Sequence, residues 1–103
     1  MRVLSGIIGL VIVTLFSTGV FAQTADLYKK ALTYYVKGDY TRASEVFKEY
    51  VSEKPDAAAY YMLGYSLYKI GRHDEARKYF KQAYLIDPGF SPSKIDYSVL
   101  RRK

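Results

Sequence analysis

The sequence predicts an all-α protein, built from two stacked helical hairpins and a C-terminal capping helix. Three observations predict this fold. Apolar residues recur at helical spacing from about residue 26 to residue 86, glycine or proline interrupts them at regular intervals, and the second half of the pattern repeats the first. The best-formed hairpin lies at 57–88, where Gly71 separates two helical segments and Pro88 ends the second. A hairpin of this kind is expected to bury its apolar face by stacking on a copy of itself.

The N-terminal 22 residues are apolar and contain one charge, Arg2. The apolar core, at about 7–16, is followed by small or polar residues that lead up to Ala22. This is the pattern of a signal peptide, and we expect cleavage before Gln23. An uncleaved anchor is the alternative, because about 20 apolar residues can span a bilayer. The cleaved form is favoured because the strongly apolar core is short and no positive cluster follows it.

The absence of cysteine bears on the compartment of the protein. The chain has no cysteine, so it can form no disulfide and cannot be a lipoprotein. Small extracellular domains usually rely on disulfides, which tilts the expectation towards a bacterial periplasm. If the N-terminal segment is uncleaved, the protein is instead anchored in the inner membrane and faces the periplasm.

The charge pattern argues against a nucleic-acid partner. The formal net charge is +6, but basic and acidic residues alternate along most of the chain. Dispersed charge indicates a solvated surface, since nucleic-acid binding needs a clustered basic patch. The terminal cluster 101–103 leaves contact with an anionic envelope surface as a further alternative.

The first hairpin is expected at 24–56. Its first helix, at about 26–37, has apolar residues at i, i+4 and i+7 and ends at Gly38. Its second helix, at about 40–53, ends before Pro55, because the residue that precedes a proline disfavours helical backbone.

A shift of 33 residues aligns this hairpin with the second one, at 57–90. Residues of similar size or turn preference then coincide at seven positions. The pairs are Leu27/Tyr60, Ala31/Gly64, Tyr34/Leu67, Gly38/Gly71, Ala43/Ala76, Phe47/Phe80 and Pro55/Pro88. A repeat of this length with two helices in each unit is the signature of a helical solenoid.

These positions resemble the tetratricopeptide repeat. Its pattern has a bulky residue, Leu-Gly, another bulky residue, a turn glycine, an alanine, an aromatic, an alanine and a proline. Residues 57–90 match it at Tyr60, Leu63, Gly64, Leu67, Gly71, Ala76, Phe80, Ala83 and Pro88. The first hairpin departs from it at Lys30, where leucine is usual, and at Tyr50, where a small residue is usual. Such departures suit an N-terminal unit whose outer face has no neighbour.

The C-terminal residues 91–103 are expected to close the stack. Ser91, Pro92 and Ser93 offer a helix start, and an apolar stripe follows. A solenoid end needs a cover with one polar face, so we expect a capping helix at about 93–101 and a basic tail after it.

The sequence gives little support for catalysis, and we predict that the protein is not an enzyme. Its single histidine, His73, lies at the start of a surface helix next to charged residues. The row Glu45, Glu49 and Glu53 is more typical of an exposed helix face than of a cation site. We therefore expect no catalytic residue, cofactor or metal.

Tyrosine is the residue type that points to a function, with 12 in the chain. The resemblance implies that a second stripe, beside the packing stripe of each first helix, lines a concave groove that holds ligand peptides. Tyrosine suits such a surface because it offers apolar area, a polar group and few rotamers. The predicted binding residues are Tyr28, Leu32, Tyr35, Tyr61, Tyr65, Tyr68 and Lys69. The alternative is that these tyrosines pack between the helices or beneath the capping helix.

The resulting prediction is an exported adaptor that binds a peptide or protein segment in the tyrosine-rich groove. The alternative is a scaffold that self-associates through its ends, because two repeats are fewer than the three that a stable stack usually needs. The expected partner is a protein or peptide, with a homo-oligomer as the scaffold form. No nucleic acid is expected, and a membrane only if residues 1–22 remain attached.

Overall fold

The computed structural model describes residues 23–102. The signal peptide or anchor predicted at 1–22 lies outside the described residues, as does Lys103. Among residues 23–102, no helix has the length and apolarity that a bilayer-spanning segment requires.

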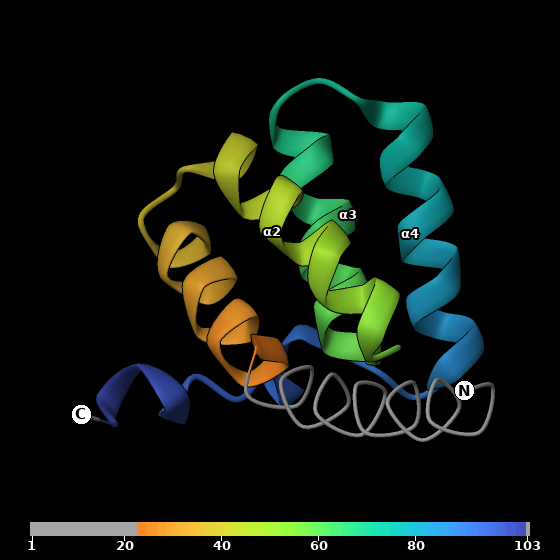
Figure 1. Ribbon diagram of the computed structural model, residues 1–103. Coiled ribbons are helices and arrows are strands. Elements are labelled where there is room, and N and C mark those ends of the chain that lie inside the picture. Colours follow the sequence, from red (N-terminus) through yellow and green to blue (C-terminus); the bar gives the residue numbers. More distant parts are fainter. Residues whose placement is uncertain (1–22, 103) are drawn as a thin grey trace, which may run out of the picture.

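The predicted all-α fold is confirmed. The described part of the chain contains helices and turns but no strand. Figure 1 shows the helices packed as two adjacent antiparallel hairpins. The elements are a helix at 23–36, α2 (Tyr40–Glu53), α3 (Ala57–Lys69), α4 (His73–Ile86) and two 3-10 helices, η1 (Pro92–Lys94) and η2 (Ser98–Arg101).

Both hairpins use the same turn. Gly38 and Gly71 have positive φ angles of 79° and 86°, a region that favours glycine. The N–H of Gly38 donates to the carbonyl of Tyr35 at 3.1 Å, and that of Gly71 donates to the carbonyl of Tyr68 at 3.0 Å. The following N–H groups, those of Asp39 and Arg72, donate to the carbonyls of Tyr34 and Leu67, respectively. The 33-residue repeat of the sequence is therefore also a repeat of hydrogen bonds.

The second hairpin is tightly packed at Gly64. A Cβ atom at Gly64 would lie 2.9 Å from Cδ1 of Phe80 and 3.1 Å from the carbonyl oxygen of Ala76. The small residue thus lets α3 approach α4 closely enough for Phe80 to cover the helix backbone. The small residue at this position of the repeat therefore serves helix packing.

The C-terminal segment differs from the predicted helix over 93–101. Ile95, between the two 3-10 helices, has extended backbone with φ −68° and ψ 126°. Its side chain is only 8% exposed and belongs to the hydrophobic core. The carboxylate of Asp96 then accepts a hydrogen bond from the Ser98 N–H at 2.8 Å, which competes with helical bonding. Burial of one side chain and this local turn replace a continuous helix.

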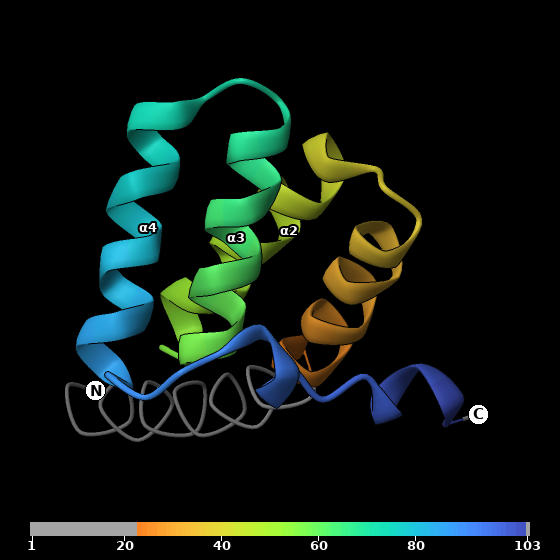
Figure 2. The same ribbon diagram turned by 180° about the vertical axis from the view of Figure 1, so that it is seen from behind.

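The same segment still covers part of the stack. After α4 the chain turns back and crosses the N-terminal parts of α3 and of the helix at 23–36 (Figure 2). Phe90 and Ile95 are both buried in the common hydrophobic core. The expected capping role is therefore filled by an irregular segment with two short 3-10 helices, which we call the C-terminal strap (residues 90–102).

Candidate functional site

The first helices of the two hairpins bring their tyrosines together on one side of the molecule. The ring of Tyr35 lies edge-on to that of Tyr65, with centroids 5.9 Å apart. We call this side, which carries Tyr28, Tyr35, Tyr61, Tyr65 and Tyr68, the tyrosine face. The C-terminal strap divides it into a covered half and an open half.

Leu32 lies outside this face, contrary to the prediction that it lines the groove. Its side chain has no exposed surface and belongs to the hydrophobic core. Ala31, the adjacent residue, is also fully buried, so the covered arc of this helix spans at least the roughly 100° between successive side chains. This arc is wider than the packing stripe inferred from the sequence, and it includes Leu32.

The covered half contains Tyr28 and Tyr61, which pack against the C-terminal strap. The hydroxyl of Tyr28 donates to the carbonyl oxygen of Asp96 at 3.4 Å. The ring of Tyr61 has its centroid 5.3 Å from that of Phe90 in the strap. For these two residues, the alternative of burial beneath the C-terminal cover describes the structure.

The open half contains Tyr40, Tyr65, Tyr68 and Lys69, with Tyr35 at its border with the strap. The ammonium of Lys69 lies 5.8 Å from the ring centroid of Tyr65 and 6.0 Å from that of Tyr40, within cation–π range. Tyr68 is 53% exposed. Lys69 makes no ion pair with any residue of the described chain. The open half thus presents aromatic surface beside a cation that is held in place by rings.

Tyr40 was not among the predicted site residues, because it begins the second helix of its hairpin. Its ring lies edge-on to Tyr35, with centroids 5.8 Å apart. The pair at the equivalent positions, Tyr68 and His73, makes the same kind of contact at 4.7 Å. The 33-residue shift that aligns the hairpins relates these two pairs, so the sequence repeat carried a signal for Tyr40.

The buried tyrosines of this face are held in the neutral form. Burial raises the pKa of Tyr28 to about 12, and the negative charge of Asp56 adds to the effect. Burial, with smaller contributions from neighbouring tyrosines, raises the pKa of Tyr35 further. The pKa of Tyr61 is raised mainly by burial as well. At neutral pH these hydroxyls act as hydrogen-bond donors and carry no charge.

These raised values predict a loss of stability in alkali. The unfolded chain releases its tyrosine protons near pH 10.0, whereas folded Tyr28 keeps its proton to about pH 12. Between pH 10 and about pH 12 the folded state binds more protons than the unfolded state. The free energy of unfolding is therefore unaffected below pH 10 and falls as the pH rises from 10 to about 12. Urea unfolding across this range measures the slope. A Tyr28→Phe variant should show a shallower slope than wild type, and identical slopes would contradict the assignment.

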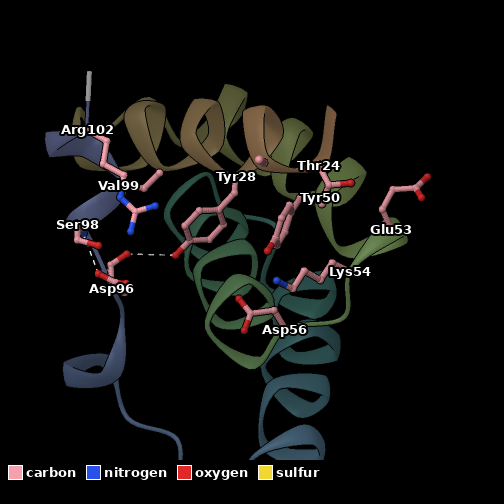
Figure 3. Close-up of a pocket in the computed structure, with 11 residues that line it drawn as sticks. Thr24, Tyr28, Tyr50, Glu53, Lys54, Asp56, Asp96, Ser98, Val99 and Arg102 are labelled. Atoms are coloured by element: carbon pink, nitrogen blue, oxygen red, sulfur yellow. Dashed lines mark hydrogen bonds between the residues drawn. The ribbon is translucent and has the colours of Figure 1, made fainter. Parts of the chain in front are cut away.

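A pocket of about 750 Å³ lies between the C-terminal strap and the first hairpin (Figure 3). The rings of Tyr28 and Tyr50, with centroids 5.1 Å apart, form one wall. Asp56 approaches from the hairpin and Arg102 from the strap, whereas the carboxylate of Glu53, at the rim, points outward. The remaining lining residues are Thr24, Ala25, Lys54, Asp96, Ser98 and Val99.

Within residues 23–102, no group of three or more histidine, cysteine, aspartate or glutamate side chains is arranged to hold a metal ion. The row Glu45, Glu49 and Glu53 lies exposed on α2, as expected for a solvated helix face. His73 is also exposed, and its ring contacts Tyr68.

Comparison with known proteins gives one finding. The family model described as tetratricopeptide repeat matches residues 28–92, which includes nearly all of both hairpins. No curated protein and no solved structure matches the chain. The match supports a protein–protein interaction module, because repeats of this family typically serve that role.

Proposed function

Because the chain belongs to the tetratricopeptide repeat family, we propose that it binds a segment of a partner protein on the open half of its tyrosine face. The protein is an interaction module, and the open half is the part of the predicted groove that the C-terminal strap leaves free. The partner segment places an apolar side chain against Tyr65 and Tyr68 and a carboxylate near Lys69.

The observation that carries this proposal is the unpaired ammonium of Lys69 above two tyrosine rings. The rings fix its position, so a carboxylate that reaches it meets an ordered donor and little side-chain entropy is lost. Exposed Tyr68 extends the apolar surface on the same helix turn. Aromatic area beside one fixed charge is typical of binding hot spots.

Affinity capture from an envelope extract tests the proposal. The variant Tyr65→Ala/Tyr68→Ala/Lys69→Ser removes the open half, and we expect it to lose at least about tenfold of each specifically captured protein, because rings of this kind dominate interface energies. Quantitative mass spectrometry of the captured proteins measures the loss.

A matched control exists on α4, where the ammonium of Lys78 lies 5.8 Å from the ring centroid of Tyr79. The variant Lys78→Ser/Tyr79→Ala removes a lysine and a tyrosine ring from another surface and should capture as wild type does. Equal capture by the open-half variant and wild type would exclude the open half as the binding surface.

The scaffold alternative is favoured by the end of α4. Leu85 is 65% exposed and is followed by exposed Ile86, whereas the equivalent residues of the first hairpin are polar Ser52 and Glu53. Apolar side chains at this end suit contact with a further helix, which a second copy could supply. Light scattering over a range of concentrations separates the two functions, since a monomer at every concentration excludes the scaffold.

We propose further that the protein is exported and acts in the periplasm. The support is the composition of residues 1–22, with one charge, an apolar core and Ala22 before the expected cleavage point. Mass spectrometry of the purified protein's N-terminus tests this, with Gln23 as the expected first residue.

A further inference from the structure

The C-terminal strap occupies the covered half much as a bound peptide would. Its proximal part is anchored by Phe90 and Ile95, whose side chains are buried in the common core. Phe90 inserts between Tyr61 and Tyr84, with ring centroids 5.3 and 6.2 Å away. The strap therefore presents two apolar anchors, five residues apart, on either side of the short 3-10 helix η1.

Two polar contacts join the helix at 23–36 to the strap, and both are made to the backbone of the strap. The Tyr28 hydroxyl donates to the carbonyl oxygen of Asp96 at 3.4 Å, and the Lys29 ammonium donates to that of Arg102 at 3.1 Å. Every extended segment offers such carbonyl groups. Recognition of the main chain, with pockets for selected side chains, is a general mode of peptide binding.

The distal part of the strap (residues 96–102) is packed less completely than the proximal part (residues 90–95). Asp96, Ser98, Val99 and Arg102 lie along the pocket of about 750 Å³ that separates the strap from the first hairpin. The side chain of Val99 is only partly buried. The distal part thus fills its site only in part, whereas the anchors at Phe90 and Ile95 are nearly closed off from solvent.

The charges beneath the distal part complement a basic segment. Asp56 lines the pocket from the hairpin beside Lys54, while Asp96 and Arg102 line it from the strap. Among the described residues Asp56 forms no ion pair. A second arginine, Arg101, precedes Arg102, so the strap ends with positive charge near the carboxylates of Asp56 and Asp96.

We propose that the strap is an intramolecular ligand, and that the covered half binds partner segments of the same chemistry in its place. Such a segment has an aromatic anchor and a branched aliphatic anchor five residues later, with a tight turn between them, and ends in basic residues. The covered and open halves are separate surfaces with different charge preferences, so binding at one does not depend on binding at the other.

A synthetic peptide with the sequence of residues 89–102, labelled with fluorescein at its N-terminus, tests the proposal against the full chain in mild detergent. In wild type the tethered strap competes at a local concentration of the order of millimolar, so the peptide binds weakly. Ile95→Ser weakens the strap, and we expect it to bind the peptide at least about tenfold more tightly by fluorescence anisotropy.

Two controls separate exchange of the strap from general loosening. Val46→Ala lowers core packing in α2, where Val46 is as buried as Ile95 but lies outside the strap, and should bind as weakly as wild type. Adding Tyr28→Phe/Lys29→Met to Ile95→Ser removes the two backbone contacts and should weaken peptide binding by about tenfold.

Val99→Ser, in the less completely packed part, serves as a second strap variant and should also increase peptide affinity, even if Ile95→Ser does not fold. Equal affinity of wild type and a folded strap variant would overturn the proposal, as would binding to Val46→Ala that matches Ile95→Ser. Equal capture by the open-half variant and wild type, with strap exchange intact, would reject the proposed function alone.

Discussion

Replacement of Phe47 by alanine is expected to lower the free energy of unfolding by about 3–5 kcal/mol, the usual cost of removing a buried aromatic ring. Phe47 is fully buried, and its ring contacts Tyr35 of the first helix with centroids 6.0 Å apart. A domain of this size has only about 5–15 kcal/mol to lose, so the variant should be partly unfolded at moderate temperature. Urea titration followed by far-UV circular dichroism measures the change.

Phe80 is the matched control, because the 33-residue shift relates it to Phe47. It is only partly buried, since no third hairpin packs on α4 among residues 23–102. Phe80→Ala should therefore destabilise the protein clearly less than Phe47→Ala. Equal losses would show that the C-terminal strap closes the second hairpin as completely as α3 closes the first.

The second large effect is expected from Gly64→Val. A Cβ at this position would lie 2.9 Å from Phe80 and 3.1 Å from the Ala76 carbonyl oxygen, which is closer than side chains tolerate. Valine adds two further methyl groups, so the helices must separate, and we expect a loss of about 2–3 kcal/mol in unfolding free energy. The higher helix propensity of valine offsets only a few tenths of this.

Gly71 provides the contrast, because no atom lies within 4 Å of its hypothetical Cβ. Its φ of 86° makes Gly71→Ala cost about 1–2 kcal/mol through backbone strain alone. Asparagine tolerates this region better than alanine, so Gly71→Asn should recover part of the loss. At position 64 the cost is steric, so Gly64→Asn should recover none of the stability that is lost in Gly64→Val. Unfolding of the four variants under identical conditions checks this, and wild-type stability of Gly64→Val would contradict the close approach.

The hairpins were predictable because their signals are local. Gly38 and Gly71 mark the turns, and the helix boundaries follow from glycine, proline and the spacing of apolar residues. Asp56, directly before α3, is of a residue type that is preferred at helix N-termini, and its carboxylate accepts the Ala59 N–H at 3.2 Å. Gly64 and its repeat partner Ala31 are both small, which is the pattern of a close helix approach.

The details of the candidate site depend on contacts that the sequence does not display. Helical spacing places Leu32 beside Tyr28 and Tyr35. Its burial depends on the neighbouring elements that pack on this side of the helix, and helical spacing alone does not show these. The strap follows from burial of Ile95 and from the Asp96 turn, which are tertiary and local polar effects that override an apolar stripe. Tyr40 enters the site from another helix, and only the repeat relates it to His73.

The strap also sets the order in which the molecule can be completed. Its hydrogen bonds join Tyr28 to Asp96 and Lys29 to Arg102, across 68 and 73 positions of sequence. The hairpins, in contrast, form from neighbouring segments, and contacts between near neighbours close faster than distant ones. Residues 90–102 follow both hairpins along the chain, so the ribosome adds them after the hairpins. A growing chain therefore displays the covered half bare until the strap has been made, and any factor that meets the nascent hairpins encounters the tyrosine face before the strap does.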